Sequence, residues 1–147
     1  MILISHRGNI TGPKPERENS PDYIFEALRA GFHVEIDVWY GTDGKFTLGH
    51  DNPQYNFPFD LLKNWHNRMW IHCKNYEALE KLVEVDKGGH NLNYFWHDSD
   101  YATLTSKGYI WSINPVKKGI LVMPESTDNQ PTNFTEGVCS DYIGEYA

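Results

Sequence analysis

Four short clusters of charged and polar residues, all in the first third of the chain, have the types and spacing that phosphate chemistry requires. They are His6-Arg7-Gly8, Glu18-Asn19, Glu35-x-Asp37 and His50-Asp51. The carboxylates Glu35 and Asp37 offer the oxygen ligands that a hard divalent cation prefers. Imidazole titrates near neutral pH, so two histidines beside a phosphate can accept and donate protons. The clusters therefore predict metal-assisted acid–base chemistry at a phosphate group.

His6 and His50 are the predicted catalytic pair, one acting as general base and the other as general acid, in an order that the sequence leaves open. The planar guanidinium of Arg7 can bind two phosphate oxygens at once. Asn19 is expected at the site, either as a contact to substrate or metal or as a brace for the loop before Ser20.

Two residues farther along the chain are also predicted to contact the substrate. Lys74 shares a face of the predicted strand Met69–Lys74 with His72, which favours a phosphate contact. Trp111 is a candidate apolar wall of the pocket, with core packing as the alternative. Asp141 is interpreted as a loop cap and His97 as a structural residue.

The elements that must position these residues follow from hydrophobic patterning. Ile2–Ser5 is a short apolar run that predicts a buried strand ending at His6. Ser20 as the N-cap, Pro21 in the first turn and Gly31 after the last turn predict a helix. Residues 33–40 alternate with period two, so Glu35 and Asp37 project from one face of a strand.

Asp43-Gly44 between two β-prone runs predicts a hairpin with a two-residue turn. In that register the numbers of paired residues sum to 87, so Asp37 is expected directly opposite His50. Facing residues in such a pair have Cβ atoms about 4.5–5.5 Å apart. The hairpin alone would then bring Asp37 and His50 together.

The remaining chain continues the alternation of strands and helices. After Met69–Lys74, Asn75 caps a helix that Gly88-Gly89 ends, and no helix is expected over residues 114–137. Further strands are expected at Asn93–His97, Tyr109–Ile113, Ile120–Met123 and Val138–Ile143. Strand–helix alternation indicates a parallel α/β sheet.

A full barrel of eight strand–helix units normally needs about 250 residues. The chain has 147 residues, which predicts a single domain over 1–147 with the fold of a trimmed TIM-type (β/α) barrel, several outer helices being shortened or missing. Strand surface left uncovered by missing helices makes a homo-oligomer an expectation.

Composition excludes several classes of partner. The formal charge of −7, without a basic patch, argues against nucleic acid and anionic membrane surfaces. No apolar run approaches the roughly 20 residues that span a bilayer, and no membrane insertion is expected. The N-terminus lacks the features of a signal peptide, and two cysteines do not form a disulfide framework, which together favour the cytoplasm.

The combined pattern resembles the signature of glycerophosphodiester phosphodiesterases: His-Arg-Gly, Glu-Asn, Glu-x-Asp, and His-Asp after a Thr-x-Asp-Gly hairpin. Two weaker similarities follow downstream, in Trp111-Ser112-Ile113-Asn114 and in the closing segment Gly137–Tyr142. The resemblance implies a metal-dependent phosphoric diester hydrolase of lipid metabolism, acting on a small-molecule or glycan phosphodiester.

Transferred position by position, the resemblance makes His6 and His50 the catalytic pair, Arg7 a phosphate ligand, and Glu35 and Asp37 metal ligands. The third ligand of the family is the glutamate of a Glu-x-Lys motif, and here the motif reads His72-Cys73-Lys74. The family suggests Mg²⁺ or Ca²⁺, whereas a histidine ligand at position 72 suits Mn²⁺ or Zn²⁺ better.

Two rival functions use the same residues. A lyase would let a neighbouring substrate hydroxyl attack the phosphorus and would release a cyclic phosphate. A non-catalytic module would bind phosphodiesters or phosphoglycans; the missing third carboxylate favours it, and the two histidines argue against it. The sequence leaves the alcohol groups of the substrate open.

Overall fold

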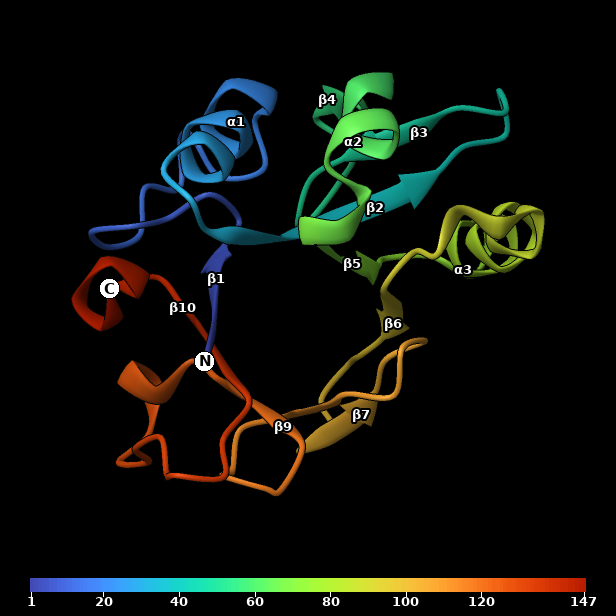
Figure 1. Ribbon diagram of the computed structural model, residues 1–147. Helices are drawn as coiled ribbons and strands as arrows, with labels where there is room; N and C mark the ends of the chain where they lie inside the picture. Colours follow the sequence, from blue (N-terminus) through green and yellow to red (C-terminus); the bar gives the residue numbers. More distant parts are fainter.

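The computed structural model describes residues 1–147 and is built on one curled, largely parallel sheet (Figure 1). The strands are β1 (Ile2–His6), β2 (His33–Tyr40), β3 (Phe46–Leu48), β4 (Tyr55–Asn56), β5 (Met69–Cys73), β6 (Tyr94–Trp96), β7 (Ala102–Leu104), β8 (Ile110–Ser112), β9 (Gly119–Val122) and β10 (Gly137–Ser140). The helices are α1 (Pro21–Arg29), α2 (Phe59–Asn64) and α3 (Tyr76–Val85), with single helical turns at His66–Arg68, Asp86–His90, Pro124–Ser126 and Ile143–Tyr146.

The strands follow one another around a ring. Parallel pairs connect them in the order β6-β5-β2-β1-β10-β9-β8, and β7 then lies antiparallel to β8. Between β7 and β6 there is no ladder, but the Thr103 hydroxyl donates to the Trp96 carbonyl at 2.8 Å. This arrangement confirms the predicted α/β class and the parallel sheet, curled in the manner of a trimmed barrel.

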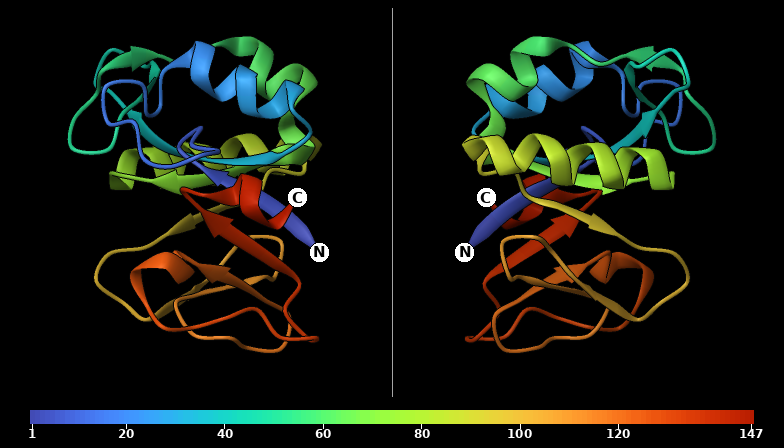
Figure 2. Two further views of the ribbon diagram at one scale, coloured as in Figure 1. Left: turned by 90° about the vertical axis from the view of Figure 1, so that its left-hand side faces the viewer. Right: turned by 90° about the vertical axis from the view of Figure 1, so that its right-hand side faces the viewer.

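The helices cover only half of the ring. In side view, α1, α2 and α3 (blue, green and yellow-green) lie together, while loops and short turns surround the other half (Figure 2). Helix α1 packs on β2, and α3 packs on β2, β5 and β6. Around β9 and β10 only the turns Pro124–Ser126 and Ile143–Tyr146 are helical. The predicted loss of outer helices is therefore confirmed.

The helix-poor half does not leave its central strands bare. Every residue of β9 and β10 is buried within the single chain. The uncovered strand surface that suggested a homo-oligomer is absent at these strands, and the oligomer itself stays a prediction. The longest helix, α3, has 10 residues, and no helix is long and apolar enough to cross a membrane.

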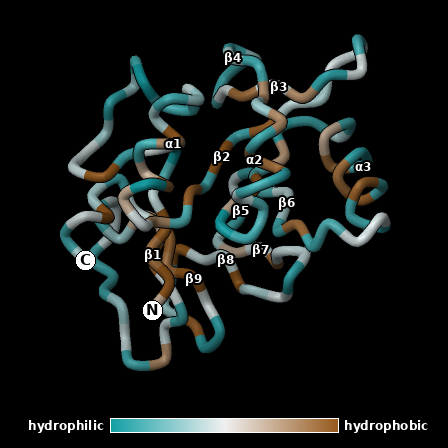
Figure 3. The backbone as a smooth tube through the Cα atoms, turned by 45° about the horizontal axis from the view of Figure 1, so that its top comes forward, coloured by the Kyte–Doolittle hydropathy of each residue, from teal (hydrophilic) through white to brown (hydrophobic).

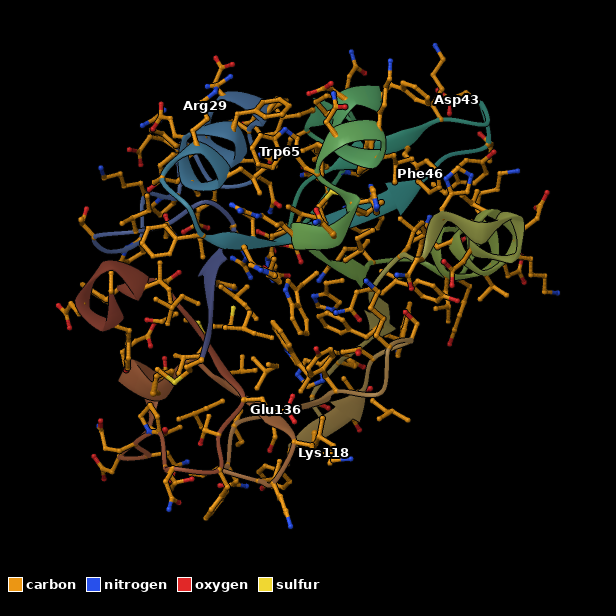
Figure 4. The ribbon with its side chains drawn as sticks, viewed as in Figure 1. Arg29, Asp43, Phe46, Trp65, Lys118 and Glu136 are labelled. Carbon is orange, nitrogen blue, oxygen red and sulfur yellow. The ribbon has the colours of Figure 1, made fainter.

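Strand alternation divides most of the buried hydrophobic side chains between two cores. Val34, Ile36 and Val38 of β2 face outward, into a cluster of 14 buried residues beneath the helices. The inner cluster has seven buried residues inside the ring: Ile4, Trp70, Phe95, Trp111, Ile120, Val122 and Cys139. Side chains fill the ring interior in Figure 4, and β1 is a continuous hydrophobic segment in Figure 3. The polar residues of the inward faces lie on top of this inner core.

Local signals account for most element boundaries. Helix α1 begins at Pro21 after an extended Ser20, whose side chain makes no capping bond, and Gly31 follows its end with φ +99°. The Asn75 side chain accepts from the backbone N–H of Ala78 and caps α3 as predicted. Helix α2 and strands β4 and β7 were not predicted, because segments of two to six residues carry no clear periodicity.

The predicted register of the hairpin is wrong by one residue. The observed pairs are Val38 with Leu48, Trp39 with Thr47 and Tyr40 with Phe46, so Asp37 lies level with Gly49 and not with His50. The loop is longer than predicted because Gly41 N–H donates to the Lys45 carbonyl at 3.0 Å, which leaves three residues in the turn. Gly44 adopts φ +76°, the left-handed residue that such three-residue loops require.

We predict that Gly44→Ala destabilises the protein by about 1 kcal/mol, because a Cβ disfavours the left-handed conformation. Only the Tyr40 hydroxyl lies near the added Cβ, at 3.6 Å, so the loss is conformational rather than steric. Gly44→Asn should recover most of it, since asparagine tolerates this conformation. Chemical denaturation of the two variants measures both values, and equal losses in both would contradict the assignment.

Candidate active site

The parallel register brings the predicted site residues together at the carboxyl ends of the strands. His6 of β1 lies level with Glu35 of β2, and Asp37 of β2 lies level with His72 of β5. Residues level with each other in a parallel pair project from the same face. Glu35, Asp37 and His72 form a group whose potential ligand atoms all lie within 4.8 Å of one another.

Positive and neutral donors surround the two carboxylates. Asp37 Oδ1 lies 3.1 Å from His72 Nδ1, and Asp37 Oδ2 lies 3.1 Å from Arg7 Nε. The Asn19 amide donates to Asp37 Oδ2 at 2.8 Å and accepts from the Asp37 backbone N–H at 2.9 Å. The contacts of Glu35 are longer, since the nearest imidazole nitrogens are 3.7 Å away on His72 and 3.8 Å away on His6.

Because of this difference in contacts, the pKa values of Glu35 and Asp37 move in opposite directions. Burial and the neighbouring Asp37 raise the pKa of Glu35 to about 7. Burial also opposes ionisation of Asp37, but the bond from His72 and the charge of Arg7 outweigh it, and the pKa of Asp37 falls below its usual range. Glu35 Oε2 is buried and has no hydrogen-bond partner. An ionised Glu35 would therefore require additional positive charge beside this oxygen.

The orientation of His72 fits a metal ligand. Its Nε2 lies 2.8 Å from the carbonyl oxygen of His97, which only accepts, so the Nε2 proton is fixed there. In the neutral ring the lone pair then resides on Nδ1, the atom that faces Asp37 and Glu35. A backbone carbonyl behind the ring is a common way to orient a metal-binding histidine. Glu35, Asp37 and His72 thus form a donor set that fits a divalent cation.

Without a cation, the same arrangement is balanced by protonation. Burial lowers the pKa of His72, but the bond to Asp37 and the charge of Glu35 outweigh it and raise the pKa above the ordinary value. An imidazolium at position 72 then faces the carboxylates. Protonated His72 and a bound cation are alternative solutions to one charge imbalance.

The Asp141 carboxylate, interpreted from the sequence as a loop cap, is bonded to the predicted catalytic histidine. Asp141 Oδ1 lies 2.7 Å from His6 Nδ1. Burial alone would lower the pKa of His6, and the bond to Asp141 together with the charge of Glu35 raises it instead. Because an ionised carboxylate only accepts hydrogen bonds, His6 Nδ1 carries a proton and donates this hydrogen bond to Asp141. The other ring nitrogen of His6, Nε2, is then free for proton transfer.

The strand register explains this pair. Ser5 of β1 lies level with Ser140 of β10, so the next residues, His6 and Asp141, come to the same height. The signal was present in the sequence as an acidic residue within the predicted strand Val138–Ile143. In the structure this strand, β10, ends at Ser140, directly before Asp141. The signal became informative only once β10 was known to pair with β1.

The chain reverses sharply after His6. Arg7 and Gly8 have φ values of +57° and +98°, and the Asn9 N–H donates to the His6 carbonyl at 2.9 Å. A Cβ at position 8 would lie 2.7 Å from the Tyr23 ring, so only glycine fits there. The turn explains the His-Arg-Gly sequence, since it places the Arg7 side chain against Asp37 directly beside His6.

Two adjacent cavities of about 520 and 510 Å³ share His6, Arg7, His50 and Met123 in their lining. The first contains Glu35, His72, Lys74 and Trp111, and the second contains Asn19, Glu18 and Asp141. The predicted site residues Lys74 and Trp111 therefore line the same hollow as the carboxylate cluster. Asn19 also borders the second cavity, although both ends of its amide are bonded to Asp37.

His50 reaches the cavity from the hairpin despite the changed register. Its Nδ1 lies 2.7 Å from the carboxylate of Asp51. The preceding residue is fixed by Trp39, whose indole N–H donates to the Gly49 carbonyl at 2.6 Å. His50 is thus carried by an anchored loop and not by a strand pair with Asp37.

Other histidines and cysteines have structural positions. His33 lies on the inward face of β2 and accepts from the Trp70 indole at 3.1 Å, and burial lowers its pKa to about 4. His97 supplies its carbonyl to His72 and also borders the larger cavity. Cys73 and Cys139 are buried free thiols, and burial raises the pKa of both.

Comparison with known proteins gives one informative result. No family model and no curated protein matches the sequence. Among solved structures, a glycerophosphodiester phosphodiesterase from Thermotoga maritima matches with a TM-score of 0.53 and 14% sequence identity, over 99% of this chain and 97% of that one. The chain therefore has a fold similar to that of this glycerophosphodiester phosphodiesterase. At this identity the likeness concerns the fold, and the activity must be argued from the site.

The pKa of Glu35 gives a prediction for the metal-free protein. Because this pKa is raised above its unfolded value, native Glu35 holds its proton between about pH 4.5 and 7 while the unfolded chain releases it, and stability falls as pH rises through this window. Glu35→Gln removes the titratable group and with it this pH-dependent loss of stability. Relative to wild type, it should gain roughly 1–3 kcal/mol between pH 4.5 and pH 8.

Urea denaturation in a chelating buffer at the two pH values measures this gain. Glu77→Gln, which alters an exposed glutamate of α3, is the control and should show no comparable change. A Glu35→Gln difference that is the same at both pH values would contradict the raised pKa.

Proposed function

We propose that the protein is a metal-dependent phosphodiesterase that hydrolyses glycerophosphodiester-type substrates. The observation that carries the proposal is the shared cavity lining: His6, Arg7 and His50 border both cavities, one of which also contains Glu35 and His72. Two proton-transfer groups, a guanidinium and a candidate metal site thus surround one hollow. A phosphate at this junction would have room for an alcohol group on either side.

Charge supports the placement of the phosphate. Arg7 and Lys74 border the larger cavity, and both can share the negative charge of a phosphodiester. Glu35, Asp37 and His72 would hold the divalent cation, which supplies stabilisation of charge on the phosphoryl oxygens when bound. The formal charge of the chain is −7, so these local cations are what an anionic substrate would need.

Proton transfer is assigned to the two imidazoles. His6 is held by Asp141 through Nδ1 and is free at Nε2, and His50 has the same kind of contact with Asp51. One ring removes a proton from the attacking water, and the other donates a proton to the leaving alkoxide oxygen. Trp111, 3% exposed, provides an apolar wall beside them.

The fold likeness supports the class of substrate. The neighbouring solved structure is described as a glycerophosphodiester phosphodiesterase, and the site proposed here lies at the carboxyl ends of the parallel strands, where enzymes of barrel folds carry their active sites. Substrates of the class include free glycerophosphodiesters and glycans that carry glycerophosphate.

The first test is hydrolysis of glycerophosphodiesters by metal-stripped protein, with Mg²⁺, Ca²⁺, Mn²⁺ or Zn²⁺ added back. We expect activity that depends on a cation and that falls at least about 100-fold in His6→Ala and in His50→Ala, the usual size of an acid–base contribution. His90→Ala, which changes an exposed histidine beyond α3, should retain wild-type activity.

Activity that survives both active-site substitutions would rule out the proposed mechanism. Phosphorus NMR of the products identifies the reaction, since a cyclic diester in place of a monoester would make the protein a lyase. Substrate binding without turnover under any metal would support a binding module instead. The same assay on glycan fragments that carry glycerophosphate extends the test to larger substrates.

His72 gives a prediction about the choice of cation. One nitrogen and two carboxylate ligands favour Zn²⁺ or Mn²⁺ over the oxygen-preferring Ca²⁺. In calorimetric titrations we expect wild type to bind Zn²⁺ at least about 100-fold more tightly than Ca²⁺, and His72→Glu to reduce this ratio at least about tenfold. His66→Glu makes the same chemical change away from the site and should leave the ratio unchanged. An unaltered ratio in His72→Glu would mean that the ring is not a ligand.

A further inference from the structure

Asn9, which closes the turn after β1, is fully buried and uses its whole hydrogen-bonding capacity. Its Nδ2 donates to Glu18 Oε1 at 2.9 Å and to Asp141 Oδ1 at 2.8 Å. Its Oδ1 accepts from the Tyr23 hydroxyl at 3.0 Å and from the Lys14 backbone N–H at 3.1 Å.

The chemistry of these partners fixes the amide in one orientation. The Lys14 N–H can only donate, so it must face the amide oxygen. Carboxylates only accept when ionised, so Glu18 and Asp141 must face the amide nitrogen. A flipped amide would lose the bonds to Lys14, Glu18 and Asp141 at once.

Each carboxylate held by Asn9 contacts a different group of the proposed machinery. Asp141 Oδ1 is shared between Asn9 and His6 Nδ1. Glu18 Oε2 lies 3.3 Å from a terminal nitrogen of Arg7. Asn9 therefore lies between the proton-transfer residue and the phosphate-binding residue, and its two N–H groups separate two like charges.

The two contacts differ in how much they depend on Asn9. Arg7 has a second anchor in Asp37 at 3.1 Å and also a bonded backbone, so the loss of Glu18 would leave it in place. The side chain of Asp141 has no hydrogen-bond partner other than Asn9 and His6. Without Asn9, the Asp141 carboxylate would be free to rotate away from His6.

We propose that Asn9 is a positioning residue for the proton-transfer step, which it serves by holding Asp141 on His6 Nδ1. The inference rests on the proposed phosphodiesterase function and extends it to a residue that touches neither substrate nor metal. Its effect falls on turnover, because the binding groups Arg7 and His72 have their own supports in Asp37 and in the His97 carbonyl.

The test is steady-state kinetics of Asn9→Ala on the metal-loaded protein. We expect kcat to fall by about 10- to 100-fold, as displacement of a catalytic group by about 1 Å does, with KM changed by less than about threefold. Asn93→Ala is the matched control, since Asn93 is also a buried asparagine but lies at the start of β6 and its side-chain oxygen has no partner. Circular dichroism establishes that each variant is folded at the assay temperature.

A double-mutant cycle separates positioning from a general structural role. If Asn9 acts through Asp141, Asn9→Ala should change kcat by less than about threefold in a background of Asp141→Ala. Multiplicative losses of kcat in the double variant would overturn the proposal. If Asn9→Ala does not fold, Tyr23→Phe removes one of the two hydrogen bonds that the Asn9 side-chain oxygen accepts, and an unchanged kcat in that variant would overturn the proposal as well.

An inactive wild type would count against the proposed function. The role of Asn9 would then be tested by the position of the proton on the His6 ring, which does not depend on activity. Nitrogen-15 NMR at a pH where His6 is neutral reports which ring nitrogen carries the proton. We expect the proton on Nδ1 in wild type and a shift towards Nε2 in Asn9→Ala. An identical proton position in both proteins would show that Asn9 does not hold Asp141 on His6.

Discussion

Two buried carboxylates on one face of β2 determine the arrangement of everything near them. Glu35 and Asp37 are 2% and 0% exposed, and each carries an acid group that water no longer solvates. An ionised group in such a place must be compensated by nearby charge or hydrogen bonds, or else it takes up a proton. Asp37 is compensated by Arg7, His72 and Asn19. Glu35 has no such compensation, and this lack of close positive charge makes the position beside Glu35 suitable for a cation.

The compensation comes from several elements, so it depends on the register of the sheet. Arg7 comes from the turn after β1, His72 from β5 and Asn19 from the loop before α1. A slip of one residue between neighbouring strands would reverse the facing of every side chain on the moved strand. Val34, Ile36 and Val38, the outward-facing apolar residues of β2, oppose such a slip, because it would place Glu35 and Asp37 beneath the helices. The apolar half of β2 thereby fixes the position of its acidic half.

Sequence reasoning predicted what depends on a single strand or helix. Period-two alternation predicted that Glu35 and Asp37 share one face of β2 and that His72 and Cys73 project from opposite faces of β5. The apolar run at the N-terminus predicted the end of β1 at His6. Sequence reasoning did not predict what depends on a loop conformation. Asp43-Gly44 fits two turn types, and the backbone of Gly44 selects the three-residue loop, which moves His50 out of line with Asp37.

Asp141 and Asn9 show the other limit of sequence reasoning. The two residues are 132 positions apart, and the first strand had to be placed beside the last before their contact could be seen. The orientation of His72 was beyond prediction for the same reason, since it depends on the carbonyl of His97, directly after the neighbouring strand β6. Chemistry assembled across strand pairs is visible only when the strand order is known.

The separation of His6 and Asp141, 135 positions apart, also has a consequence for the making of the protein. Chains are synthesised from the N-terminus at about 5–20 residues per second. The candidate cation-binding residues all lie on β2 and β5, so they are synthesised well before Asp141. The partner of His6 arrives only with the final strand. A nascent or prematurely terminated chain can therefore contain all three candidate cation ligands and still lack the carboxylate that pairs with His6.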